Sequence, residues 1–516
     1  MDSSSTAISF HVRSLAPLYT LVILQKMETA ITAVAGELVS RIISFTINKY
    51  YGSKICLEEE VERLKHLLMR VHTVVEEADA RYITNSGMLM QLKVLSEAMY
   101  RGYHALDTFK FQLHKESSMN KVSNSLSFSS ANPLKRPRTI VDSTNKGKVL
   151  NLKVHGALGS LETIVANIAE FVSLLGGCER MSRRPYDAYL YIDNFMFGRL
   201  TEKQKLLNFL LDHNPPGAPA VLPIIGGLAF GKKTLVAHVC ADERVRSHFS
   251  SILHLNGDNF LTVLGHERAI LGMQLVVVEF VSEVDDVDWK AFYSFVTRTN
   301  RRSKVIIISK LERLARFGSV RPIFLNSLSY EEFWYLFKIL AFGSANPSEH
   351  PRLVQIAEEF AMDLHMGGSL VAANALAEVL RGNLNAQLWL CILDRCRRVI
   401  DRNLSVYGEH LNLRLDQGHE VDLRDFSLHP ASPLRIIPCT GSRSTTYVPV
   451  KKELPQVTFA ELLVDPSVRP KGEFNLLSWE SRLPPYTSFV HFAPNCTQDM
   501  PEGRPLSGRK RRGVTF

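Results

Sequence analysis

Apolar side chains recur at helical spacing through the first part of the chain. Helical pattern begins at 27–50, and the clearest helix is predicted between Glu58 and Ala80. Within it, apolar residues lie alternately three and four positions apart, which is typical of a coiled-coil-like seam. The seam consists of Val61, Leu64, Leu68, Val71 and Val75. With further helices predicted at 88–100 and 103–114, residues 27–116 should form a small antiparallel helical bundle.

The segments around this bundle differ in pattern. Residues 1–26 combine serines, one arginine and an apolar run but lack a basic start and a small-residue cleavage site, so we expect a non-structural extension. Residues 117–148 are rich in Ser, Asn and Lys without a period, which predicts a flexible linker. Helical pattern resumes at 149–182, where we expect a helix and a connector.

The period changes again after about residue 193, where short apolar runs alternate with helical stretches in the manner of a parallel α/β sheet. Strands are predicted at 220–225, 251–255, 274–279 and 304–309, and helices at 201–212, 232–241, 287–298, 330–341, 350–364 and 369–380. We therefore expect an α/β subdomain over 183–325 and an appended helical subdomain over 326–400. Residues 401–516 carry many prolines and little periodicity, which predicts a poorly ordered region.

One strand runs directly into a candidate phosphate-binding loop. Gly226, Gly231 and Lys232 stand at P-loop spacing after a strand and before a helix, where backbone N–H groups and a lysine can surround phosphates. The next residue should offer a hydroxyl to magnesium, but it is Lys233, and Thr234 comes one residue late, a turn of about 100° on a helix. A cation there would oppose a metal by on the order of 4 kcal/mol at 4 Å. The loop therefore predicts a phosphate site without magnesium.

The acidic position of such sites is also altered. The strand at 274–279 ends in Glu279, which can hold a metal-bound water only weakly, followed by Phe280. Phe280 can serve as neither acid, base nor ligand, so we expect a core aromatic there. Hydrolysis of a nucleotide is not expected, and the chain is predicted not to be an enzyme.

Composition and charge limit the class of protein and its cellular location. The 516 residues are 45% hydrophobic with a formal charge of +9, which suits two to four folded domains. Two short basic runs, at 135–138 and 509–512, are expected to be solvated charge, so nucleic-acid binding is not favoured. No apolar run approaches the roughly 18 residues of a membrane span. Sparse cysteines suit reduced thiols and a cytoplasmic or nuclear location.

The order of these blocks resembles the NB-ARC domain of plant disease-resistance proteins of the coiled-coil class. The matching blocks are 197–210 (adenine entry), 224–239 (phosphate loop), 274–281 (acidic strand), 303–310 (phosphate-sensing strand), and 323–343 with 350–376 (helical subdomain). The helical bundle likewise resembles that family's N-terminal domain, with Asp107 as the remaining acid of its signalling motif. The resemblance implies a P-loop NTPase-like fold and an ADP-dependent switch that signals through protein partners.

The resemblance also assigns roles to single residues. The implied nucleotide-binding residues are Gly226, Gly227, Gly231, Lys232, Lys233, Thr234 and Lys310; the implied adenine-side residues are Phe197, Gly198, Arg199, Ser369 and Leu370; Glu279 is a weak metal ligand. Several positions depart from the family: Leu228 and Ala229 replace glycines, Lys310 replaces an arginine, and the proline expected before Leu370 is missing. With neither leucine-rich repeats nor a His-Asp switch motif after residue 400, the sequence predicts a truncated, degenerate member.

Three hypotheses follow, in this order of preference. The first is a defence protein that retains ADP without magnesium and contacts other resistance or signalling proteins, or a second copy of itself, through the N-terminal helical bundle. The second is an adaptor or scaffold in which the α/β domain binds no nucleotide and the helical seam contacts other resistance proteins. The third is an active ATPase, which needs a metal site that this sequence lacks.

Overall fold

The computed structural model describes residues 57–125, 141–180, 197–212, 218–257, 260–261, 272–299, 301–427, 434–438, 454–465, 468, 472–481 and 487–494. The chain divides into two compact units, Met1–Asn208 and Phe209–Phe516, and each is described by itself. The expected extension at 1–26, the helix expected at 27–50 and both basic runs lie outside the described residues.

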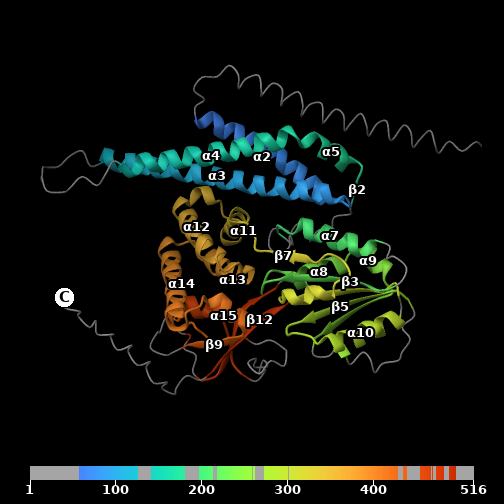
Figure 1. The fold of residues 1–516 in the computed structure, drawn as a ribbon. Helices are drawn as coiled ribbons and strands as arrows, with labels where there is room; N and C mark the ends of the chain where they lie inside the picture. Colours follow the sequence, from blue (N-terminus) through green and yellow to red (C-terminus); the bar gives the residue numbers. More distant parts are fainter. Residues whose placement is uncertain are drawn as a thin grey trace, which may run out of the picture. The chain divides into compact units, whose positions relative to one another are not determined.

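Long helices build the first unit (Figure 1). They are α2 (Leu57–Asp79), α3 (Ser86–Ser125), α4 (Val141–Ala166) and α5 (Ile168–Gly176). α2 packs against both α3 and α4, and α3 packs against α4. All five seam residues, from Val61 to Val75, are at most 4% exposed. The expectation that this seam contacts partner proteins is therefore wrong: it packs against the neighbouring helices and forms the core of the unit.

α3 is one continuous helix, whereas the sequence predicted two helices, at 88–100 and 103–114. It runs through Gly102, where an added Cβ would lie 2.7 Å from Leu68 Cδ2 and 3.0 Å from Leu161 Cδ1. Gly102 thus allows close approach to α2 and α4 instead of ending the helix. The expected linker at 117–148 is also shorter than predicted, because α3 extends to Ser125 and α4 begins at Val141.

The first unit also takes in most of α7 (Leu200–Leu211), which was expected in the α/β subdomain. The short strand β1 (Arg81–Tyr82) pairs with β2 (Glu179–Arg180). The buried Gln204 amide donates to Arg81 O at 2.8 Å and accepts from Ile83 N at 3.2 Å, and so continues the hydrogen bonding of this segment. The predicted boundary at residue 183 therefore differs from the compact division, which falls within α7.

A parallel sheet forms the centre of the second unit, as predicted, with five strands where four were expected. Its strands are β3 (Ala220–Gly226), β4 (Ser251–Asn256), β5 (Gln274–Phe280), β6 (Lys304–Ser309) and β7 (Ile323–Leu325), in the order β4-β5-β6-β3-β7. The helices α8 (Lys232–Cys240), α9 (Glu243–His248) and α10 (Asp286–Thr299) accompany the sheet (Figure 1). The internal strands β3, β5 and β6 were predicted because such strands are continuous apolar runs, the edge strand β4 was predicted from a short apolar run, and the three-residue β7 was missed.

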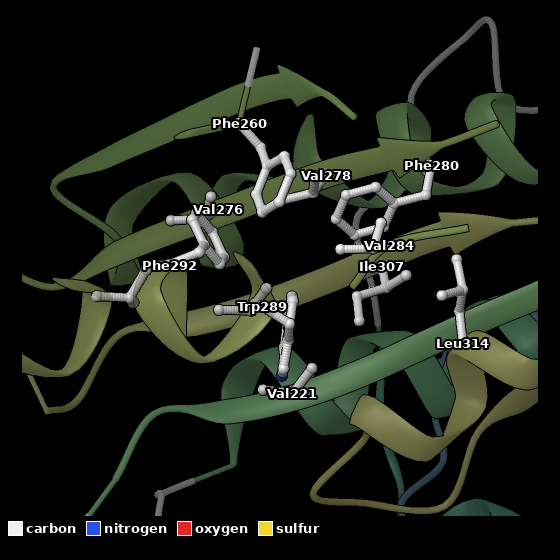
Figure 2. Close-up of a cluster of buried hydrophobic side chains, with 12 residues drawn as sticks. Val221, Phe260, Val276, Val278, Phe280, Val284, Trp289, Phe292, Ile307 and Leu314 are labelled. Atoms are coloured by element: carbon white, nitrogen blue, oxygen red, sulfur yellow. The ribbon is translucent and has the colours of Figure 1, made fainter. Parts of the chain in front are cut away.

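Aromatic side chains fill the core between this sheet and α10 (Figure 2). Phe280 is 2% exposed, with its ring centroid 5.1 Å from that of Phe260 and 6.4 Å from that of Trp289. Edge-to-face contacts of this kind stabilise a core beyond simple burial. The prediction that Phe280 is a core aromatic is confirmed.

The predicted helical subdomain follows the sheet. It contains α11 (Tyr330–Phe342), α12 (Pro351–His365), α13 (Leu370–Arg381) and the longer α14 (Ala386–Tyr407). Ser329 begins α11 with a capping box, since its side chain accepts from Glu332 N while the Glu332 carboxylate accepts from Ser329 N. α11 packs against α12 and α13, and α12 packs against α14.

The prediction of a poorly ordered region after residue 400 is wrong for the part that the structure describes. It contains α15 (Leu411–Gln417), β8 (Val421–Asp422), β9 (Arg435–Pro438), β10 (Gln456–Thr458), α16 (Phe459–Val464), β11 (Phe474–Glu480) and β12 (Ser488–Ala493). The strands form a second sheet in the order β10-β11-β12-β9-β8. α13 packs against α16 and β11. Prolines such as Pro438 and Pro455 stand at the ends of strands, so they delimit this sheet rather than prevent it.

A buried lysine closes the end of α7 inside the second unit. Lys304, the first residue of β6, is 1% exposed, and its Nζ donates to the carbonyls of Phe209 at 2.6 Å, Leu210 at 3.2 Å and Asp212 at 2.5 Å. These are the carbonyls that a helix leaves without internal partners at its C-terminus. Burial lowers the pKa of Lys304 from 10.5 to about 8, and the nearby Asp212 charge opposes part of this effect.

This pKa predicts a pH-dependent stability. Between about pH 8 and 10.5 the unfolded chain binds the Lys304 proton and the folded chain does not, so the free energy of unfolding should rise with pH, by at most about 3 kcal/mol. Urea unfolding of the wild type and Lys304→Met at pH 7.5, 9 and 10 measures this. We expect the rise only in the wild type; parallel pH profiles of the two proteins would contradict it.

Candidate phosphate-binding site

The phosphate loop lies between the internal strand β3 and the start of α8, as the sequence predicted. β3 ends at Gly226, where an added Cβ would lie 2.7 Å from the Leu325 carbonyl oxygen. Gly231 caps α8 with a φ of 81°, and Ala229 also has a positive φ, of 60°. A non-glycine residue in that region costs about 1–2 kcal/mol. The loop therefore keeps its turn even though Ala229 replaces a glycine.

The Lys232 side chain folds back over the loop. Its Nζ donates to Gly226 O at 2.7 Å and to Gly227 O at 2.6 Å. An ammonium has three donors and no acceptor, so these two bonds fix a positive charge above the loop, beside the N-terminus of a nine-residue helix. Positive charge, a helix N-terminus and a curled backbone together favour a phosphate group.

The neighbouring Lys233 pairs with the acidic strand. Its Nζ lies 2.7 Å from Glu279 Oε2, with the two side chains 49% and 27% exposed. The parallel register brings this pair together, because β5 and β3 both end at the same edge of the sheet on either side of β6. Thr234 is only 6% exposed and faces the interior of the unit. These residues do not fit a magnesium ion, since an ammonium is paired with the carboxylate that would have to bind it.

An aromatic side chain that no motif pointed to connects the loop with the helical subdomain. Cβ atoms added at Gly227 and at Gly368 would lie 3.0 Å and 3.1 Å from Phe230 Cζ. The tip of this ring thus lies close to both glycines, and Gly368, with a φ of 62°, belongs to the turn before α13. The loop is therefore packed against this turn by the chain's own side chain. Only the position of Phe230 inside the loop could have signalled this contact.

The remaining predicted residues fall in three places. Lys310 follows β6 at the same edge of the sheet as Glu279. Ser369 accepts from Ala372 N at 3.2 Å as the N-cap of α13, and Leu370 is 2% exposed. Phe197, Gly198 and Arg199 belong to the first unit, where the Phe197 ring lies 5.1 Å from that of Tyr100. Adenine-side roles for these residues stay predictions.

Gly226 offers a test of the loop's packing. In Gly226→Ala the new methyl group would approach the Leu325 backbone of β7, and such overpacking destabilises a core by about 1–3 kcal/mol. Gly382→Ala is the matched control, because Gly382 has a helical φ of −63° and its nearest contact would be 3.3 Å. Denaturant unfolding should show the loss in the first variant only; equal stability of both variants would contradict the close approach of β7.

The described residues also bear on two further properties, membrane spanning and metal binding. No single described helix is long and apolar enough to cross a membrane, although the bent pair Leu152–Ala166 and Ile168–Gly176 meets the requirement together. Its residues Val154, Leu158 and Leu161 are buried in the first unit. Among the same described residues, no cluster of His, Cys, Asp and Glu could hold a metal ion.

The chain is similar to known proteins over much of its length. Residues 34–136 match the model of the Rx N-terminal domain. The disease resistance protein RGA2 of Solanum bulbocastanum is 23% identical over 366 residues, which cover 65% of this chain and 36% of RGA2. An RPP13-like disease resistance protein of Arabidopsis thaliana is 21% identical over 391 residues, covering 69% of this chain and 36% of that protein. The chain thus spans about a third of these relatives' length.

One solved structure shows only weak similarity to this chain. A chain in the structure of Drosophila ORC bound to DNA matches 43% of this chain and 66% of its own length, at 12% identity and a TM-score of 0.24. That score carries no argument about function.

Proposed function

Because the chain belongs to the plant disease-resistance proteins that carry an Rx N-terminal domain, we propose that it holds ADP at its phosphate loop in a defence response. The helical first unit would contact other resistance or signalling proteins, or a second copy of the chain. ADP would be a bound ligand and not a substrate. The names of the relatives support a role in defence, and the geometry of the phosphate loop supports ADP binding.

The observation that supports ADP binding is the position of Lys232. Its ammonium is fixed over Gly226 and Gly227 at the N-terminus of α8, where phosphate oxygens can accept from it and from the backbone N–H groups of the loop. Lys310 stands at the same edge of the sheet and adds positive charge, and Lys233 there offsets the negative charge of Glu279. Together these residues fit a diphosphate group.

Two features of the site oppose hydrolysis. Glu279 is paired with Lys233, and the next residue, Phe280, is buried in the aromatic core (Figure 2). Hydrolysis needs a group that orients water beside the terminal phosphate and a charge that stabilises the transition state. Neither side chain of this strand end offers the first. We therefore propose a holder of nucleotide rather than an ATPase.

Protein contacts of the first unit would have to use side chains other than the buried seam. Met69 on α2 and Met90 and Val94 on α3 are 69%, 64% and 44% exposed. Exposed methionines adapt to differently shaped partners. We propose these positions as the apolar part of a partner surface.

A second candidate function is an adaptor that binds no nucleotide. The contact of Phe230 with Gly227 and Gly368 favours it, because the chain's own aromatic ring joins the loop to the helical subdomain. In such a protein the α/β domain would serve as a folded spacer, and only the surface of the first unit would carry function.

Thermal unfolding separates the two candidates. ADP that binds only the folded protein stabilises it by RT ln(1 + [L]/Kd), about 2.7 kcal/mol at a hundredfold excess over Kd. We expect the full chain to melt at a higher temperature in ADP and at an unchanged temperature in adenosine, which lacks phosphates. Equal melting in buffer, adenosine and ADP up to millimolar concentration would favour the adaptor.

A further inference from the structure

The Lys233–Glu279 pair occupies the two positions from which a P-loop site normally holds its metal. Lys233 stands directly after the loop lysine, and Glu279 is the next-to-last residue of β5, which lies two places away from β3 in the sheet. Their 2.7 Å contact joins an ammonium and a carboxylate in a spot that is open to solvent, since Lys233 is half exposed. The pair therefore has the same charge arrangement as a metal ion bound to the acidic strand, except that the cation is the ammonium of Lys233.

At such a position a lysine can neutralise phosphate charge, as a bound metal ion would. It is a compact point charge on a flexible stem with three donors, so it can remain near a carboxylate and still donate to a phosphate oxygen. It cannot share Glu279 with magnesium, because the two cations would repel each other at this distance. Lys233 should thus replace the metal and also exclude it.

We propose that Lys233 is the built-in cation of this site, held by Glu279, and that it makes the binding of a nucleoside diphosphate independent of magnesium. This inference rests on the proposed function, which requires only that ADP binds at the loop. The inference adds that an ion pair within the chain replaces the metal site. It also adds that a single substitution can restore magnesium binding.

The test is ADP binding to the full chain, measured by isothermal titration in EDTA and in millimolar magnesium in excess over ADP. Four proteins are compared: the wild type, Lys233→Thr, the double variant Lys233→Thr/Glu279→Ala, and Lys290→Thr. Lys290→Thr is the control, because it removes the same charge from an exposed position on α10 of the same unit. Circular dichroism melts confirm that each variant is folded.

We expect the wild type and Lys290→Thr to bind ADP with the same Kd, within about twofold, in both buffers. Lys233→Thr should bind at least tenfold more weakly in EDTA and recover in magnesium, because the new hydroxyl and the released Glu279 can hold the ion. The double variant should not recover.

The outcomes distinguish the two proposals. A wild type that binds ADP tenfold more tightly in magnesium than in EDTA overturns the role of Lys233 and leaves ADP binding in place. A Lys233→Thr variant that binds as tightly as the wild type in EDTA, or that gains nothing from magnesium, overturns it as well. If no protein binds ADP in either buffer, the proposed function itself fails and the inference fails with it.

Discussion

Lys232→Ala is expected to raise the Kd for ADP about 100-fold. The substitution removes the ammonium that lies over Gly226 and Gly227, at 2.7 and 2.6 Å from their carbonyl oxygens. A hydrogen bond to a charged group contributes about 1.5–3 kcal/mol, which corresponds to roughly 10- to 150-fold in affinity. Because this side chain also fixes the curl of the loop, we expect a value toward the upper end of that range.

The measurement is equilibrium binding of a fluorescent ADP analogue to the full chain, with unlabelled ADP as competitor. Lys290→Ala serves as the control for the loss of one positive charge, since it is exposed on α10. Unchanged affinity in Lys232→Ala would place any nucleotide elsewhere on the protein.

Leu68→Asp is expected to unfold the first unit. Leu68 is 2% exposed, and its side chain lies close to Gly102 of α3. The substitution would therefore leave an unpaired carboxylate in the core of the bundle. Buried charge without a partner is among the few changes that cost more than about 4 kcal/mol. Loss of partner binding in this variant would therefore report unfolding and not a lost interface.

The adjacent residue provides a matched control for that prediction. Met69 is 69% exposed on the same helix, so Met69→Asp should change the free energy of unfolding by no more than about 0.5 kcal/mol. Far-UV circular dichroism melts of the two variants compare them directly. A Leu68→Asp protein that melts with the wild type would show that the seam is not the core.

Features that depend on neighbouring residues were predictable from the sequence. The strands β3, β4, β5 and β6 are compact apolar runs, and the phosphate loop is a short motif between a strand and a helix. The pairing of Lys233 with Glu279 was not predicted; the sequence analysis gave Glu279 a weak metal role, although parallel strands bring the ends of β3 and β5 to the same edge. The role of Phe280 as a core aromatic followed from its chemistry.

Features that depend on residues far apart in the sequence could not be predicted from it. Periodicity placed Leu68 on an apolar stripe but could not show that α3 and α4 cover it. The second sheet pairs strands such as β9 and β12, which are far apart along the chain and individually short. Phe230 meets Gly368 only because the helical subdomain folds back onto the loop. In each case tertiary packing decided what local pattern left open.

The most direct test of the account is a calorimetric titration of the full wild-type chain with ADP in EDTA. The loop geometry, with Lys232 fixed over Gly226 and Gly227 and Lys233 beside Glu279, predicts saturable binding of one ADP per chain without metal. A titration without binding heat, together with an unchanged melting temperature in ADP, would contradict the claim that this loop holds a nucleotide.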